Sequence, residues 1–123
     1  MTPFGRRVRE LRRERGVTMK EMAAALRVTP AYLSALEHGH RGKPSWRLVQ
    51  AIIGYFNVIW DEAEELERLA RISHPRVVID TAGLAPQATE AANRLAEAIS
   101  DMSSAEIAKL LALLDGRTRR RGK

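Results

Sequence analysis

Cysteine is absent from this sequence of 123 residues, and aromatic residues make up only 5% of it. The lack of thiols excludes disulfide bonds and every zinc site that uses cysteine ligands. Long hydrophobic runs are also missing, because the longest, residues 51–56, is interrupted by Gly54. It is far shorter than the about 20 apolar residues that a membrane helix needs. No apolar leader stands at the N-terminus, so we expect a soluble, cytoplasmic protein.

Sequence patterns of enzymes are absent too. There is no glycine-rich phosphate loop, and nothing brings the Ser, His and Asp residues together as a nucleophile, base and acid. His38 and His40 form a His-x-His pair, but Glu37 is the one acidic residue close to them, which argues against a metal site. We therefore expect no enzymatic activity, no metal and no cofactor, and the sequence implies no small-molecule effector.

Charge is distributed unevenly along the chain, whose net charge is +6. Residues 1–60 carry eleven basic and four acidic side chains, and their net charge is +7. Residues 61–116 carry five basic and eleven acidic side chains, and residues 117–123 add five basic ones. A basic head that precedes an acidic body is typical of nucleic-acid-binding proteins, although a generic solvated basic surface is the alternative.

The stretch 18–39 predicts two short helices joined by a tight turn. Thr18 and Glu21 have the spacing of a capping box at the start of the first helix. Thr29 can cap the second helix, with Pro30 at the first helical position, where its missing N–H costs nothing. Small and aliphatic side chains can form one seam between the two helices: Ala23, Leu26, Val28, Leu33 and Leu36.

Three further helices are expected around this pair. The first begins after Thr2 and ends at Gly16, the next runs from Ser45 to Asn57, and the last covers 59–73. Their apolar residues recur at helical spacing and should form the core. The expected core positions are Phe4, Val8, Leu11, Leu48, Val49, Ile52, Ile53, Phe56, Ala63, Leu66, Leu69, Ala70 and Ile72, with Trp46 and Trp60 as core or interface anchors.

The remaining residues form a different kind of segment. After Pro75, residues 76–80 are β-prone, and they predict either an extended linker or one half of a strand pair with a second copy. Two amphipathic helices should follow, one from Pro86 to about residue 100 and one from Ser103 to a stop at Gly116. They could pack on the helix 59–73, on a partner subunit, or on both. The like-charged residues 117–123 predict a disordered tail.

Residues 4–56 resemble the helix-turn-helix domain of Cro and phage repressors, the XRE family. The similarity is strongest in VTPAYLSALEHG, residues 28–39, which fits the family's recognition helix, and it covers slightly under half of the chain. It implies an all-α fold, with a five-helix Cro/repressor-like head in residues 1–73. A short β-prone segment and two amphipathic helices in 74–116 would follow.

The resemblance also implies a function. The chain would be a sequence-specific, DNA-binding transcriptional regulator that reads half-sites in the major groove as a homodimer and associates with the nucleoid. The alternative is a protein-interaction module with the same fold, such as an antitoxin or an adaptor. The basic head favours the regulator, and binding to heparin or mixed DNA would separate the two.

Matching to the family also assigns DNA-contact positions. The recognition helix has no Gln, Asn or Arg at these positions, so direct base readout is expected to be modest. The family usually has Gln where this chain has Met19, which leaves phosphate contacts to Lys20 and backbone amides. Arg12 and Glu37 match a family ion pair that orients the recognition helix. The implied DNA-contact residues are Thr18, Lys20, Thr29, Pro30, Ala31, Tyr32, Ser34, Ala35, His38, His40, Arg41 and Lys43.

Two groups of residues also have plainer interpretations. Tyr32 and Ser34 could be ordinary surface residues, and the arginines at positions 6, 7 and 9 could form a solvated face. The apolar residues after Pro75 would be a liability in a monomer, so we expect them to hold a homodimer together. These residues are Val77, Val78, Ile79, Leu95, Ile99, Ile107, Leu110, Leu111 and Leu114.

Overall fold

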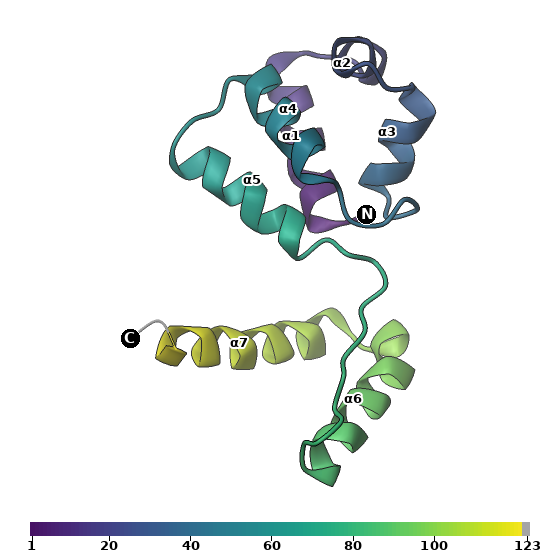
Figure 1. Ribbon diagram of the computed structural model, residues 1–123, viewed down its shortest axis with the longest axis vertical. Coiled ribbons are helices and arrows are strands. Elements are labelled where there is room, and N and C mark those ends of the chain that lie inside the picture. The colour runs from purple at the N-terminus through teal and green to yellow at the C-terminus, as the bar shows by residue number, and fades with distance from the viewer. Residues whose placement is uncertain (122–123) are drawn as a thin grey trace. The chain divides into compact units, whose positions relative to one another are not determined.

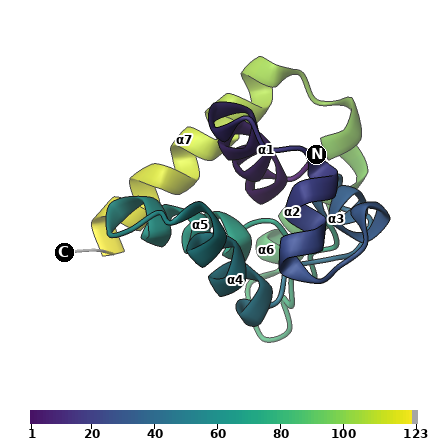
Figure 2. The same ribbon diagram turned by 90° about the horizontal axis from the view of Figure 1, so that it is seen from above.

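The structure, a computed structural model, describes residues 1–121 and the surroundings of the side chains in residues 1–117 (Figures 1 and 2). The described residues form α-helices and one short 3₁₀ helix but no strand, which confirms the predicted all-α class. The chain divides into two compact units, Met1–Val77, called the head below, and a second unit that begins at Val78. No helix within residues 1–121 combines the length and apolar character of a membrane span.

The head is built around its first helix. In Figure 1, α1 lies between α3 and α5, and it contacts both of them. The consecutive helices α2 and α3 pack side by side, while α4 packs against α2 and α5 (Figures 1 and 2). The helices are α1 (Pro3–Arg15), α2 (Met19–Leu26), α3 (Pro30–Glu37), α4 (Trp46–Phe56) and α5 (Asp61–Arg71).

Capping side chains fix where four of these helices begin. The hydroxyls of Thr2, Thr18, Thr29 and Ser45 each accept a hydrogen bond from the backbone N–H three residues further on, at 3.0–3.2 Å. Such a bond satisfies one of the N–H groups that a helix start leaves unpaired. The predicted helix starts at these residues are confirmed.

The helices of the head pack around a single apolar core. Every one of the five helices contributes at least one side chain that is less than one tenth exposed. Small Ala23 and Ala70 are among them and let neighbouring helices approach closely. The buried hydrophobic residues are Phe4, Val8, Leu11, Met22, Ala23, Leu33, Leu36, Val49, Ile52, Phe56, Val58, Leu66 and Ala70.

The end of α5 differs from the prediction. The helix ends at Arg71, and Ile72, expected in the core, is 55% exposed. Ser73 is buried in its place, because its hydroxyl accepts from the Phe4 N–H at 2.8 Å and donates to the Leu69 carbonyl at 2.5 Å. One polar side chain thus ties the end of α5 to the start of α1, which an apolar pattern could not reveal.

The two tryptophans are not in the core. Trp46 is 68% exposed at the first position of α4, and Trp60 is 80% exposed just before α5. Trp60 has φ 53°, which carries the chain into a helix that begins at Asp61 and not at Ile59 as expected. The core interpretation of both residues is therefore wrong, and the interface interpretation stays a prediction.

The second unit contains α6 (Pro86–Ala98), the 3₁₀ helix η1 (Ile99–Asp101) and α7 (Ser104–Arg121). None of its residues from 78 to 117 is buried. Residues 76–80 form no strand, because residues 1–121 offer them no partner strand. Pairing of this segment with a second copy stays a prediction.

The predicted stop of the last helix at Gly116 is wrong. The helix α7 continues to Arg121, and Gly116 lies inside it. Residues 117–121 of the predicted disordered tail therefore lie in α7, and residues 122–123 lie outside the described residues.

Candidate nucleic-acid interface

A turn of three residues joins α2 to α3. Arg27 has the left-handed conformation, φ 60°, and its N–H donates to the Ala24 carbonyl at 3.2 Å. The next N–H, of Val28, reaches the Ala23 carbonyl at 3.0 Å. Ala23 is fully buried, so the two helices meet over a side chain that occupies little space. This sharp turn between two short helices is the geometry of a helix-turn-helix motif.

The helix α3 is held by its inner face and by its last residue. Leu33 and Leu36 are buried in the core, and Glu37 is only 2% exposed. Both carboxylate oxygens of Glu37 accept hydrogen bonds from the Arg12 guanidinium, at 2.7 and 2.8 Å. Both hydrogen bonds come from one guanidinium nitrogen, Nη2, and this charge-assisted contact ties the end of α3 to α1.

Backbone contacts reinforce the same junction. The Thr2 N–H donates to the Glu37 carbonyl at 3.0 Å. A Cβ on Gly5 would overlap that carbonyl oxygen and come within 2.6 Å of the Glu37 Cα. Only glycine therefore allows α1 and α3 to approach this closely, and the outer face of α3 is presented by a rigid support.

The outer face of α3 carries the residues that the resemblance assigned to the major groove. Thr29, Pro30 and Ala31 are exposed at the start of the helix. Tyr32, Ser34 and Ala35 are half-buried, so their atoms are only partly available for contact. The exposed positions thus gather in the N-terminal half of α3, where the free N–H groups of the helix also lie.

The loop after α3 brings basic side chains next to that face. Arg41 is exposed, and its guanidinium carbon lies 5.7 Å from the centre of the Tyr32 ring. This distance is within the range of a cation–π contact. Lys43 is exposed further along the loop, and His38 and His40 stack their rings with centres 6.4 Å apart.

The start of α2 offers a second set of N–H groups. Thr18 and Lys20 are exposed there. Met19, at the position where the family usually has Gln, is half-buried and packs against the core. Its side chain therefore supports α2 and leaves the solvent-facing role to Lys20.

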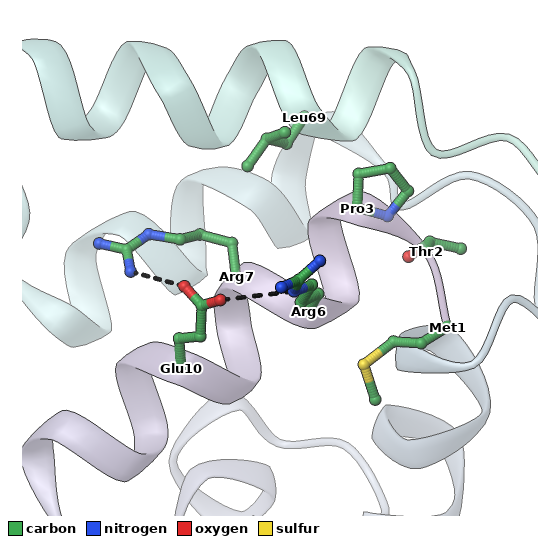
Figure 3. Close-up of a pocket in the computed structure, with 7 residues that line it drawn as sticks. All are labelled: Met1, Thr2, Pro3, Arg6, Arg7, Glu10 and Leu69. Atoms are coloured by element: carbon green, nitrogen blue, oxygen red, sulfur yellow. Dashed lines mark hydrogen bonds and ion pairs between the residues drawn. The ribbon is translucent and has the colours of Figure 1, made fainter. Parts of the chain in front are cut away.

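The arginines at the start of α1 are arranged differently. Arg6 and Arg7 flank Glu10 and form ion pairs with it at 3.6 and 3.1 Å, beside a hollow of about 380 Å³ below Leu69 (Figure 3). Their charge is thus partly neutralised within the head. This is the geometry of a solvated, ion-paired helix face.

Sequence reasoning missed two features of this surface. The contact between Arg41 and Tyr32 depends on the path of the loop, which no spacing rule predicts. Arg47, exposed in the first turn of α4, was not assigned a role, although it lies on the wall of a groove that Tyr32 and Arg41 also line. Its position two residues after the Ser45 cap, in the first turn of α4, is the signal that could have drawn attention to it.

His38 and His40 are the His-x-His pair of the sequence. The described part of the chain contains no group of three or more His, Cys, Asp or Glu side chains that could hold a metal ion. His38 Nδ1 lies 2.8 Å from the Ser34 carbonyl oxygen, so this nitrogen is engaged by the backbone of α3.

The residues expected to hold a dimer together are accessible in the single chain. Val78 is 92% exposed, and Leu95, Ile107 and Leu110 are half-buried. The others of the set are about half to three quarters exposed: Val77, Ile79, Ile99, Leu111 and Leu114.

Comparisons with known proteins match the head. The family described as helix-turn-helix domain matches residues 3–66. The Uncharacterized HTH-type transcriptional regulator RghRB of Bacillus subtilis is 33% identical over 61 residues, which are 50% of this chain and 44% of that protein. The HTH-type transcriptional regulator DdrOP3 of Deinococcus deserti is 40% identical over 52 residues, 42% of this chain and 40% of that protein. The chain thus spans less than half of either relative, and no solved structure matches it.

Proposed function

The chain belongs to the helix-turn-helix domain family, and we propose that it is a sequence-specific, DNA-binding transcriptional regulator. The observation that carries this proposal is the exposed N-terminal half of α3, presented by a helix whose other face and last residue are fixed in the head. A recognition helix needs both properties, because its first residues must reach base edges in a constant orientation. Bound at a promoter, the protein would block polymerase or recruit it.

The accessible positions of α3 have chemical roles in this proposal. Pro30 and Ala31 offer apolar contacts to thymine methyl groups, and the hydroxyls of Tyr32 and Ser34 can bond to base edges. The N–H groups at the starts of α2 and α3 favour phosphates, with Lys20 beside the first of them. Few of these groups discriminate between bases strongly, so sequence-dependent DNA shape contributes to the choice of site.

In this proposal the loop after α3 contacts DNA phosphates, and the salt dependence of binding tests those contacts. Replacing Arg41 and Lys43 by Ala should weaken binding and lower the slope of log affinity against log salt by about one unit for each lost phosphate contact. Binding would be measured by fluorescence anisotropy on a duplex selected from genomic fragments. The matched control replaces Arg9 and Arg13 by Ala, which removes the same charge from exposed positions of α1. Equal slopes for the two double variants would remove this loop from the DNA surface.

A homodimer is the second part of the proposal. Two half-sites need two recognition helices about one turn of DNA apart, roughly 34 Å. The second unit offers an apolar face for dimerisation. Four of its residues recur at helical spacing in α7 and none of them is buried: Ile107, Leu110, Leu111 and Leu114. Burial against a symmetry mate would remove this apolar surface from water and join two heads.

Sedimentation tests the dimer. The full chain should sediment as a dimer at micromolar concentration, and Leu110→Asp with Leu111→Asp should sediment as a monomer. Lys109→Asp is the control, because Lys109 projects from the opposite side of α7 at about 100° per residue. A wild-type chain that stays monomeric, or a Lys109 variant that dissociates equally, would contradict this interface.

A protein-interaction module is the second candidate function. The observation that favours it is the exposed pair Ile59 and Trp60, at 62% and 80%, next to the acidic first turn of α5. An antitoxin or adaptor would use such apolar surface to contact a partner. Failure to bind heparin and mixed DNA at low salt would favour this candidate over the regulator.

A further inference from the structure

A groove separates the start of α3 from the start of α4 in the head. Its volume is about 580 Å³, within the about 300–1,000 Å³ that small-molecule sites occupy. The apolar part of its wall comes from Leu26, Val28, Leu48 and Ala51. The first three are half-buried against the core, so this wall is fixed by the packing of the head.

Two cations stand at this apolar wall without a carboxylate. Arg41 and Arg47 line the groove, both are exposed, and neither forms an ion pair within the described residues. The buried Arg12, in contrast, is neutralised by Glu37. The groove therefore presents unneutralised positive charge beside apolar surface.

Hydroxyl groups add donors to the same groove. Thr29 and Ser45 line it, and each hydroxyl oxygen already accepts a helix N–H, at 3.0 and 3.2 Å. Their O–H groups stay available to donate. Together with the two guanidinium groups, every polar side chain of this set can offer hydrogen to an anion.

An apolar wall beside two guanidinium groups and two hydroxyl donors favours one class of ligand. A carboxylate can accept two parallel hydrogen bonds from a guanidinium, which suits Arg41 or Arg47. An inorganic anion alone would leave Leu26, Val28 and Leu48 in contact with water, whereas an aromatic or branched aliphatic body would cover them. The complementary molecule therefore has an anionic end and an apolar body.

We propose that this groove binds a small organic carboxylate with an apolar body, and that this ligand regulates the protein by competing with DNA. The second half rests on the proposed function, because Thr29, Tyr32 and Arg41 line the groove and are also assigned to the DNA surface. A ligand that occupies them blocks those contacts. DNA affinity then falls as the ligand concentration rises.

The binding test uses 2-naphthoate and its neutral analogue 2-naphthamide on the full chain without DNA. Backbone NMR should show shifts at Val28, Thr29 and Leu48 with naphthoate, and weaker binding of naphthamide. Shifts confined to residues 78–117, or none at saturating probe, would overturn the site. Equal affinities for the two probes would overturn the role of the arginines.

Matched variants locate the ligand. Arg47→Gln should weaken the binding of naphthoate about tenfold, the loss expected for a hydrogen bond to a charged group. It should leave the affinity for naphthamide unchanged. Ala51→Trp should fill the groove and abolish binding of both probes. The controls are Arg9→Gln and Ala24→Trp, at exposed positions outside the groove lining. Unchanged core amide shifts verify that each variant folds, and controls that bind as weakly as the groove variants would overturn the assignment.

A third arm separates this inference from the proposed function. Naphthoate should displace a labelled duplex from the wild-type chain but not from Ala51→Trp, provided that this variant still binds DNA in the anisotropy assay. DNA binding that naphthoate leaves unchanged would overturn the competition, whereas a chain that binds naphthoate but no DNA would overturn the proposed function and the competition with it. The binding site itself is tested by the probe-binding experiments, which contain no DNA.

Discussion

The head and the second unit contain similar helices but reach very different degrees of burial. Each helix of the head carries buried hydrophobic side chains, whereas none of residues 78–117 is buried. Amphipathic helices are stabilised mainly by burial of their apolar face. Five short helices can surround one core, but α6 and α7 leave side chains such as Leu111 and Leu113 more than half exposed. The head therefore buries its apolar faces within one chain, whereas the described part of the second unit leaves its apolar faces accessible.

The same contrast appears in the polar contacts. The ion pair of Arg12 and Glu37 is held between two helices of the head, with side chains 13% and 3% exposed. The ion pair of Glu90 and Arg94 lies within α6, with side chains 59% and 78% exposed. The shortest distances of the two pairs are nearly equal, 2.7 and 2.8 Å, but the first pair is shielded from water and the second is exposed.

Removing the acid from each pair gives the largest expected difference between the units. Glu37→Gln leaves the Arg12 guanidinium buried without a counter-charge, which should destabilise the head by about 3–5 kcal/mol. Glu90→Gln removes an exposed i,i+4 pair and should cost about 0.5 kcal/mol or less. Urea unfolding would be followed through amide NMR signals of each unit separately. Similar losses of unfolding free energy for the two variants would contradict the difference between the units, because they would mean that the pair in α6 is as buried as the pair in the head.

A glycine in each unit gives a second, smaller contrast. Gly5→Ala places a Cβ against the Glu37 carbonyl and should destabilise the head by about 3 kcal/mol through overpacking. Gly116→Ala meets nothing within 4 Å inside α7, and should stabilise this helix by about 0.5–1 kcal/mol. Thermal unfolding of the head and the helical content of α7 are the respective measurements.

The glycine pair also tests the junction that orients α3. Gly54→Ala is the control within the head, because a Cβ there meets nothing within 4 Å. A loss for Gly5→Ala no larger than for Gly54→Ala would mean that α1 and α3 can separate at little cost. The rigid support that the DNA proposal needs would then be absent.

Much of the head could be predicted from local chemistry. Capping side chains such as Thr18 and Thr29 act within three residues, so their effect is readable from the sequence. The burial of Phe4 and Leu36 follows from helical spacing. The ion pair of Arg12 and Glu37, 25 positions apart, came from resemblance to a family, since no local rule joins residues at that separation.

What could not be predicted depends on contacts distant in sequence or on solvent. The Ser73 hydroxyl reaches Phe4 across 69 positions, and the polar residue gave no sign of burial. Trp46 and Trp60 were expected as core or interface anchors, and the core forms without them. Gly116 was expected to end a helix, but a glycine does so only where the chain takes the left-handed conformation, as it does at Gly16.

Acid gives the smallest effect, and it acts on both units. Hydrogen bonds with Arg68 lower the pKa of Glu65 in α5, and hydrogen bonds from the Ser103 N–H and hydroxyl lower the pKa of Glu106 at the start of α7. A carboxyl whose pKa is lowered by folding stabilises the structure above its unfolded pKa, here 4.5. This contribution is lost as the pH falls through the lower pKa of the folded state.

The consequence should differ between the units because, among residues 1–117, only those of the head form a core that retains its helices. As the pH falls below about 4.5, the first turn of α7 should unwind while α5 stays helical, since the 2.9 Å bond from the Ser103 N–H is one of the few that hold that turn. ¹³Cα shifts of residues 104–107 and 62–65 measure this between pH 5 and 3. Glu106→Gln keeps an acceptor without a titrating group and should abolish the pH dependence in α7, whereas Glu97→Gln should not. Unwinding of α5 at the same pH as α7 would show that the core contributes nothing to the helices around it.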